Sequence, residues 1–197
     1  MPLIRVQDSA TVIGRLVSLS AKHLNDFKTR WRKGLQTTVD QDQYWDWERK
    51  QRIYLTDGTG IYEGYAIECE QLTQGMMLLQ IKGYRSQVEP SRRLVYVHSL
   101  ATAPWNRVSN PAPNGFRAVG SALLRFAQFR SENLGYGGLV GLHSLPSAET
   151  FYQKMGMIDG GKDDEKGGLT YFEWYQRRTS LLEELGVDVE SRESIDE

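Results

Sequence analysis

The 197-residue sequence is poor in metal-binding and disulfide-forming side chains, with one cysteine, Cys69, and three histidines. A single cysteine excludes an internal disulfide, and so few ligands argue against a structural zinc site. No run of about 18 apolar residues occurs, so no membrane span is expected. Residues 1–10 also lack the apolar stretch of a signal peptide, and these absences together predict a cytoplasmic protein.

The charge is nearly balanced, at a formal net value of -1. No strong field is therefore expected to attract nucleic acid or an anionic membrane. The glycine-rich phosphate loops G-x-G-x-x-G and G-x-x-x-x-G-K-[ST] are absent, which argues against the common nucleotide-binding folds. The G-x-S-x-G pattern is absent too, which argues against a serine hydrolase.

The composition is that of an ordinary globular domain, with 40% hydrophobic and 25% charged residues. This length suits one domain with a sizeable core. We expect that domain over residues 1–185 and a flexible acidic tail over 186–197.

Hydrophobic periodicity predicts alternating helices and strands. A first strand is expected at residues 3–6 or 11–17, Asp42 is expected to cap the second helix, and a turn is expected at 73–75. The order predicts an α/β fold with a central mixed β-sheet flanked by helices. The expected elements are helices over 18–35, 44–54 and 118–132, a short helix between Pro146 and Gly156, and strands over 61–69, 76–81, 94–101, 139–143 and 170–175.

The segment that carries chemical information begins at the apolar strand 94–101. A loop follows and opens a helix near Arg117. The first N–H groups of a helix have no partner within it, and the helix dipole favours an anion there. Gly120 has no Cβ at the point where an anion would approach. The spacing therefore predicts a phosphate or pyrophosphate site.

Two motifs resemble those of the GNAT superfamily of N-acetyltransferases. Arg117-x-x-Gly120-x-Ala122 is similar to the family's Gln/Arg-x-x-Gly-x-Gly/Ala signature, and residues 148–157 resemble its Ala-x-x-Phe/Leu-Tyr-x-Lys-x-Gly-Phe segment. The resemblance covers about residues 60–176. Two positions depart from the pattern: Leu145 stands where the family has asparagine, and Met157 where it has phenylalanine.

The resemblance implies that acetyl-CoA is the co-substrate and that its acetyl group passes directly to an amine. Cys69 is then not needed as a nucleophile and is expected in the core. Tyr152 matches the tyrosine that protonates the departing thiolate. The pyrophosphate would be bound by Arg117 and by the N–H groups of Val119, Gly120, Ser121 and Ala122, and the pantetheine arm by Leu100, Ala101 and Thr102.

The base that deprotonates the amine has three candidates. His98 is the first, because it lies on the central strand and titrates near neutral pH. In regular alternation it would share a face with Tyr96 and Leu100. His143 and Glu63 are the others, and a water chain is a further option. Trp45 and Trp105 are expected beside the acceptor.

These features predict an N-acetyltransferase acting on the primary amine of an unidentified acceptor. One alternative is an acyl-CoA-binding sensor or partner module without catalysis. Another is a toxin-like acetyltransferase that modifies a macromolecule such as aminoacyl-tRNA, which would need a basic groove. Dimers are frequent in the family, so the resemblance leaves a homodimer open.

Overall fold

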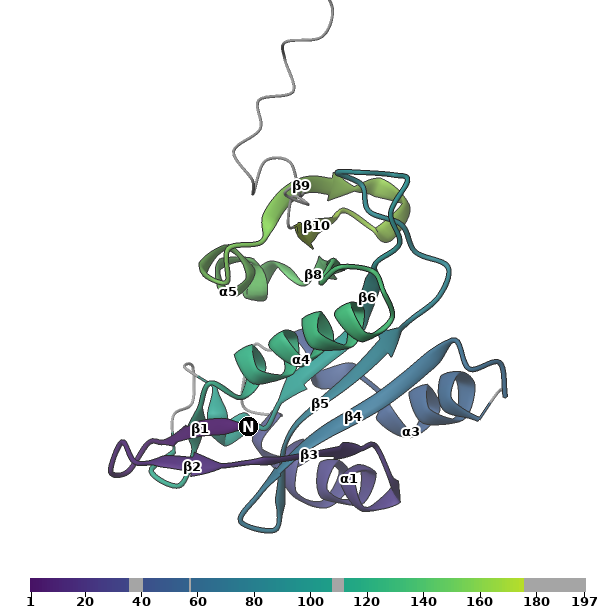
Figure 1. Cartoon of the computed structure of the whole chain (residues 1–197). Coiled ribbons are helices and arrows are strands. Elements are labelled where there is room, and N and C mark those ends of the chain that lie inside the picture. The colour runs from purple at the N-terminus through teal and green to yellow at the C-terminus, as the bar shows by residue number, and fades with distance from the viewer. Residues whose placement is uncertain (36–40, 57, 108–111, 176–197) are drawn as a thin grey trace, which may run out of the picture.

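The structure, a computed structural model, describes residues 1–35, 41–56, 58–107 and 112–175. Its centre is a seven-stranded mixed sheet in the order β3-β4-β5-β6-β8-β10-β9, and a small sheet has the order β2-β1-β7 (Figure 1). The predicted α/β fold is confirmed. The strands are β1 (Pro2–Arg5), β2 (Thr11–Ile13), β3 (Arg15–Ser18), β4 (Tyr62–Cys69), β5 (Leu72–Gln80), β6 (Val95–Thr102), β7 (Phe116–Arg117), β8 (Val140–Ser144), β9 (Ile158–Asp163) and β10 (Leu169–Trp174).

Helices lie on both faces of the large sheet. The predicted first and second helices each contain a π-helical stretch, and within the described residues no helix has the length and apolar character to cross a membrane. The helical elements are α1 (Ala21–Asp26), η1 (Phe27–Trp31), α2 (Arg32–Leu35), η2 (Gln41–Tyr44), α3 (Trp47–Lys50), η3 (Gln51–Leu55), η4 (Pro104–Asn106), α4 (Val119–Asn133), η5 (Pro146–Ala148), α5 (Glu149–Lys154) and η6 (Asp164–Lys166).

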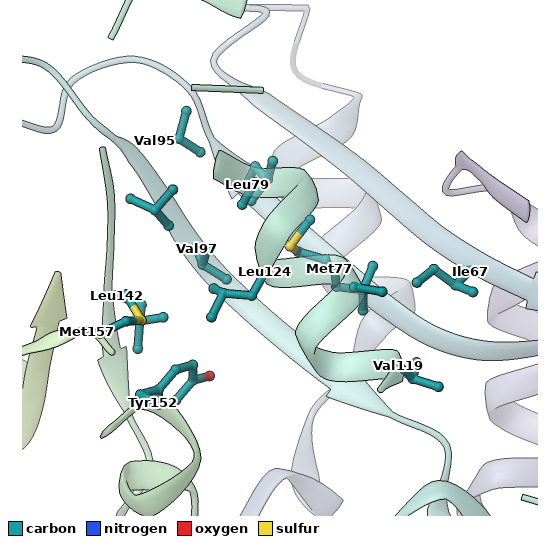
Figure 2. Close-up of a cluster of buried hydrophobic side chains, with 14 of the residues drawn as sticks. Ile67, Met77, Leu79, Val95, Val97, Val119, Leu124, Leu142, Tyr152 and Met157 are labelled. Carbon is teal, nitrogen blue, oxygen red and sulfur yellow. The ribbon is translucent and has the colours of Figure 1, made fainter. Parts of the chain in front are cut away.

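Strand β5 is buried on both of its faces, because helices cover each side of the sheet. Met77 and Leu79 pack in the cluster under α4, which Figure 2 shows with Leu124. Met76 and Leu78 point the other way and pack in the cluster under α1, η1, α2 and α3. The alternation of side chains along a strand divides the core into these two layers.

The turn between β4 and β5 lies earlier than predicted. It is formed by Glu70 and Gln71, whose φ angles are 50° and 63°, so the prediction of a turn at 73–75 was wrong. Gly75 serves packing instead, because a Cβ there would lie 2.7 Å from a side-chain carbon of Val119. Its absence lets α4 approach the sheet closely.

Three other predictions also need correction. Asp46, not Asp42, caps the second helix, by accepting a hydrogen bond from the N–H of Arg49. The N-terminal region forms strands at both of the places that were considered, rather than one. Strand β9 was missed, because its sequence IDGGKD is exposed, polar and rich in glycine, which gives no alternation of apolar residues. The expected tail 186–197 lies outside the described residues.

The sheet is forked between β6 and β8. The two strands run parallel but pair only at Val95–Val140 and Tyr96–Gly141. On its other edge β6 pairs with β5 over nearly its whole length, from Tyr96 to Thr102. Beyond the two shared pairs, β6 and β8 separate, and no strand of the described residues pairs with the polar backbone groups along this edge of β6.

Candidate functional site

The fork holds a cleft with a volume of about 940 Å³. Its lining comes from α4 on one face of the sheet and from the α3 region on the other, so the cleft connects the two faces. The N-terminus of α4 lies at one end, which we call the α4 end, and Trp45 and Lys50 lie at the other, the α3 end. A volume of this size suits an extended small-molecule ligand.

The α4 end presents backbone N–H groups that have no partner within the helix. The first bond within the helix runs from the N–H of Ala122 to the carbonyl of Ala118. The N–H groups of Val119, Gly120 and Ser121 therefore precede the helical hydrogen-bond pattern and face the cleft that these residues line. Ala118 has the left-handed φ of 70°, which turns the chain sharply before the helix. Such a loop and helix start favour an anion.

No close protein contact requires the missing Cβ of Gly120, so the space beside this residue is available to a ligand. A Cβ at this position would lie 3.4 Å from the ring of Phe151 and 3.7 Å from the side chain of Thr102, which are ordinary contacts. Alanine is therefore accommodated by the surrounding protein atoms.

The free edge of β6 supplies hydrogen-bonding groups in the middle of the cleft. The N–H of Ala103 donates to Gln74 of β5. Because antiparallel pairing alternates, the backbone groups of Leu100 and Thr102 point away from β5 and into the fork. Arg107 donates to the carbonyl of Thr102 and also forms a bidentate ion pair with Asp42, with both N–O distances 2.8 Å.

His98 sits in a β-bulge. Leu78 pairs with Ser99 and Leu79 with Val97, which leaves His98 as the extra residue of β6. The bulge breaks the alternation, so the expected shared face of His98 and Leu100 is wrong: Leu100 packs toward α4, whereas His98 contacts the ring of Tyr54. Burial, followed by the positive charge of Lys50, lowers the pKa of His98 to about 4.

Lys50 reaches into the α3 end of the cleft. Its Nζ donates to Ser99 Oγ at 2.8 Å and lies 4.8 Å from the ring centroid of Trp45. Ser99 Oγ is also 3.2 Å from Nδ1 of His98. A lysine can only donate, so Ser99 keeps its own proton for this second contact. Burial lowers the pKa of the Lys50 ammonium group.

His143 lies in a chain of three hydrogen-bonded side chains. Its Nε2 is 2.9 Å from a carboxylate oxygen of Asp163, and its Nδ1 is 2.8 Å from the hydroxyl of Tyr96. The carboxylate favours a proton on Nε2, which leaves Nδ1 to accept from the tyrosine. Burial lowers the pKa of His143 although Asp163 opposes that effect. Tyr96 and His143 both line the cleft.

Tyr152 forms part of both the cleft and the core. Figure 2 shows it beside Leu142 and Met157, and the residue is 7% exposed. Its hydroxyl makes no hydrogen bond within the part of the chain that the structure describes. Burial raises the pKa of this phenol, so it remains a protonated donor at neutral pH.

Most of the predicted site residues line this one cleft, but their roles remain predictions. The set comprises Trp45, His98, Leu100, Ala101, Thr102, Arg117, Val119, Gly120, Ser121, His143 and Tyr152.

Three predicted residues lie elsewhere. Ala122 is packed in the core and its N–H is bonded within α4. Glu63 forms a bidentate ion pair with Arg130 near the C-terminus of α4, at 2.7 and 2.8 Å. Trp105 packs edge-on against Trp31, and its Nε1 donates to a side-chain oxygen of Gln74, so it supports the loop rather than the cleft.

Sequence reasoning missed Lys50 and Tyr96 as cleft residues. Lys50 lies in a run of charged residues that resembles a solvated helix face, and Tyr96 in a run of apolar ones. Neither carries a local signal, because each reaches the cleft through packing of distant elements. No cluster of three or more metal-ligating side chains forms within the described ranges.

No protein-family model and no curated protein matches the sequence. Solved structures do match. PaiA N-acetyltransferase from Thermoplasma acidophilum in complex with coenzyme A has a TM-score of 0.57 and 14% identity, over 84% of this chain and 100% of that one. The N-acetyltransferase YlbP from Bacillus subtilis, also in complex with coenzyme A, has a TM-score of 0.53 and 14% identity, over 83% and 97%.

A third match is an acetyltransferase of the GNAT family from Staphylococcus aureus, with a TM-score of 0.52 and 12% identity, over 82% of this chain and 98% of that one. The chain therefore has the GNAT acetyltransferase fold. The resemblance read from the two sequence motifs is confirmed at the level of the fold.

Proposed function

We propose that the protein is an N-acetyltransferase that moves the acetyl group of acetyl-CoA directly to an amine. The observation that carries this proposal is the forked sheet, whose cleft begins at the open N-terminus of α4. Coenzyme A is bound in two of the similar solved structures, which supports the same class of co-substrate here. A thioester supplies an activated acyl group, and this chain supplies the groups that orient it.

The cofactor lies along β6 in this proposal. The N–H groups of Val119, Gly120 and Ser121 bind the pyrophosphate, and Arg117 adds a positive charge. The backbone groups of Leu100 and the N–H of Thr102, which point into the fork, hold the pantetheine arm. The N–H of Leu100 also donates to the thioester oxygen as negative charge develops on it.

The reaction exchanges one bond for another. The amine nitrogen forms a bond to the carbonyl carbon, the carbon–sulfur bond breaks, and sulfur leaves with the electron pair. One proton leaves the nitrogen and one reaches the sulfur. Tyr152 donates a hydrogen bond to the leaving sulfur, because its buried phenol is protonated.

The chain of Tyr96, His143 and Asp163 takes up the proton from nitrogen. The phenol oxygen of Tyr96 accepts that proton as its own passes to Nδ1 of His143, and Asp163 stabilises the imidazolium that forms. This assignment is favoured over His98, because a pKa of about 4 makes that imidazole a weak base.

The test is a calorimetric titration of the protein with acetyl-CoA, alongside Gly120→Glu and Gly120→Ala. We expect binding by the wild-type protein and at least about 100-fold weaker binding by the glutamate variant, whose carboxylate blocks and repels the pyrophosphate. Gly120→Ala is a control for folding, since the protein has space for the added methyl group. Release of coenzyme A thiol with an amine then shows turnover. Binding without turnover would instead support the acyl-CoA-binding module, and no binding by a folded wild-type protein would refute both.

A further inference from the structure

Lys50 is a half-buried cation that has no anionic partner among the described residues. Its Nζ donates to a neutral hydroxyl, that of Ser99, and lies over the ring of Trp45. No ion pair joins it to a carboxylate anywhere in the described residues. A buried charge without a counter-ion is costly for a folded protein, so such a position is a candidate for binding an anion.

A second lysine faces the same part of the cleft. Lys166 of η6 lines it from the side of β9 and β10, and it forms no ion pair within the described segments. The neighbouring acids of η6, Asp164 and Glu165, do not line the cleft. The positive charges of Lys50 and Lys166 both lower the pKa of His98, so both lysines act on the same part of the cleft.

Negative charge in the cleft is already neutralised. Asp42 is the carboxylate among the lining residues, and it is held by both terminal nitrogens, Nη1 and Nη2, of the Arg107 guanidinium. The α3 end therefore repels an acceptor that carries only positive charge, and it attracts one that also carries an anion.

We propose that the acceptor is a small amine that also bears an anionic group, and that Lys50 binds this group while the amine points into the fork. This proposal rests on the proposed function and specifies its acceptor. The carboxylate or phosphate of the acceptor would complete the ion pair that Lys50 lacks, and Trp45 would cover its apolar part.

The geometry also limits the length of the acceptor. Ser99, which holds Lys50, directly precedes Leu100, whose N–H faces the reacting carbonyl in the proposed mechanism. Successive residues of a strand are about 3.3 Å apart. The anionic group and the amine are therefore separated by few bonds, as in an α- or β-amino acid.

A matched series of acceptors tests the proposal. β-Alanine, phosphoethanolamine, ethanolamine and ethylenediamine all have an amine on a two-carbon spacer, with a carboxylate, phosphate, hydroxyl or second amine at the other end. We expect kcat/KM for at least one anionic compound to exceed that for ethanolamine by about 10-fold, with ethylenediamine the poorest substrate. The comparison of β-alanine with phosphoethanolamine identifies which anion is used.

Variants of Lys50 give the decisive comparison. Lys50→Met should bring the four compounds within about 2-fold of one another, and Lys50→Glu should favour ethylenediamine, both with unchanged affinity for acetyl-CoA. Arg49→Met removes a neighbouring exposed charge and should keep the wild-type preference. A wild-type preference for ethanolamine or ethylenediamine would overturn the proposal, as would an anion preference that survives in Lys50→Met.

A binding readout separates this proposal from the proposed function. In protein labelled with ¹⁵N-tryptophan, the indole signal of Trp45, assigned with Trp45→Phe, should shift on titration with β-alanine or phosphoethanolamine but not with ethanolamine. Lys50→Met should abolish the shift. If acetyl-CoA does not bind but this shift occurs, the acetyltransferase proposal fails while the anion site stands. If acetyl-CoA binds and no anionic amine produces either a shift or turnover, the anion site fails alone.

Discussion

At the α4 end of the cleft, the groups that face a ligand are backbone N–H groups of consecutive residues, Val119 to Ser121. At the α3 end they are side chains from separate elements: Lys50 from α3, His98 from β6 and Lys166 from η6. Backbone groups are fixed by the path of the chain, whatever side chains surround them. Side chains can be exchanged one at a time, so the α3 end can change its ligand while the α4 end keeps the same one.

The largest effect we expect comes from Tyr152, which lines the cleft that joins the two ends. Tyr152→Phe removes the hydrogen-bond donor to the leaving sulfur and should lower kcat about 100-fold, with KM for acetyl-CoA nearly unchanged. Steady-state kinetics measures both values. Tyr136→Phe, on a tyrosine that donates to Ile81 far from the cleft, is the matched control and should keep kcat. An equal loss in both variants would mean that Tyr152 acts through stability alone.

The α3 end should be sensitive to pH because of His98. Its pKa is about 4 in the folded protein against an ordinary value of 6.5, so the unfolded chain binds the proton more readily. The burial of neutral His98 therefore makes its full contribution to the free energy of unfolding above about pH 6.5. This contribution is lost as the pH falls to about 4. A shift of this size corresponds to about 3 kcal/mol, which partial exposure reduces to about 2 kcal/mol.

Urea unfolding at pH 7 and pH 4 measures this loss. His98→Gln, which does not titrate, should lose less stability over the same interval by about 2 kcal/mol. Equal losses in the two proteins would place the pKa of His98 near its ordinary value and would contradict its burial beside Lys50.

Removal of one exposed charge at the α4 end should weaken the binding of acetyl-CoA. Arg117→Ala takes away a cation next to the proposed pyrophosphate site and should weaken acetyl-CoA binding about 10-fold, with less effect at high salt. Calorimetry at two salt concentrations measures this. Arg125→Ala removes an exposed arginine further along α4 and should leave the affinity as it is. If both variants bind alike, the α4 end relies on backbone groups alone.

The smallest effect concerns the backbone before α4. Ala118 has a φ of 70°, where a side chain costs about 1 kcal/mol relative to glycine. Ala118→Gly should therefore raise stability by up to about 1 kcal/mol, since the greater freedom of glycine in the unfolded chain offsets part of the gain. Thermal unfolding measures the shift. Ala21→Gly, at an ordinary helical position, should have the opposite sign, and a loss of stability in Ala118→Gly would show that the methyl group is needed.

The α4 end could be predicted from the sequence because its determinants lie close together in the chain. A strand, a loop and a helix start with Arg117 and Gly120 fall within about 25 residues, so local patterns suffice. The long strands and α4 were predicted for the same reason. The edge strand β9 was not, because its exposed residues carry no apolar pattern.

The α3 end could be predicted only in part: Trp45 and His98 were expected at the site and line the cleft, but their partners there were not. Lys50 meets Ser99 because α3 packs across the sheet, and Tyr96 meets His143 because β6 and β8 are neighbours in space. Glu63 and Trp105 were assigned to the site on residue type, but long-range partners, Arg130 and Gln74, hold them elsewhere. The bulge at His98 is set by the pairing of β6 with β5, which no local pattern of β6 reveals.

The two residue pairs that join β6 to β8 also divide the sheet mechanically. Strands β3 to β6 form one plate, strands β8, β10 and β9 form another, and the seam between them is the short stretch Val95–Tyr96 with its partners. Because only two residue pairs join the two plates, we expect bending of the sheet to concentrate at this seam and to change the width of the cleft. A molecule that touches Leu100 on one plate and Tyr152 on the other ties the two plates together, so its binding stiffens the whole sheet.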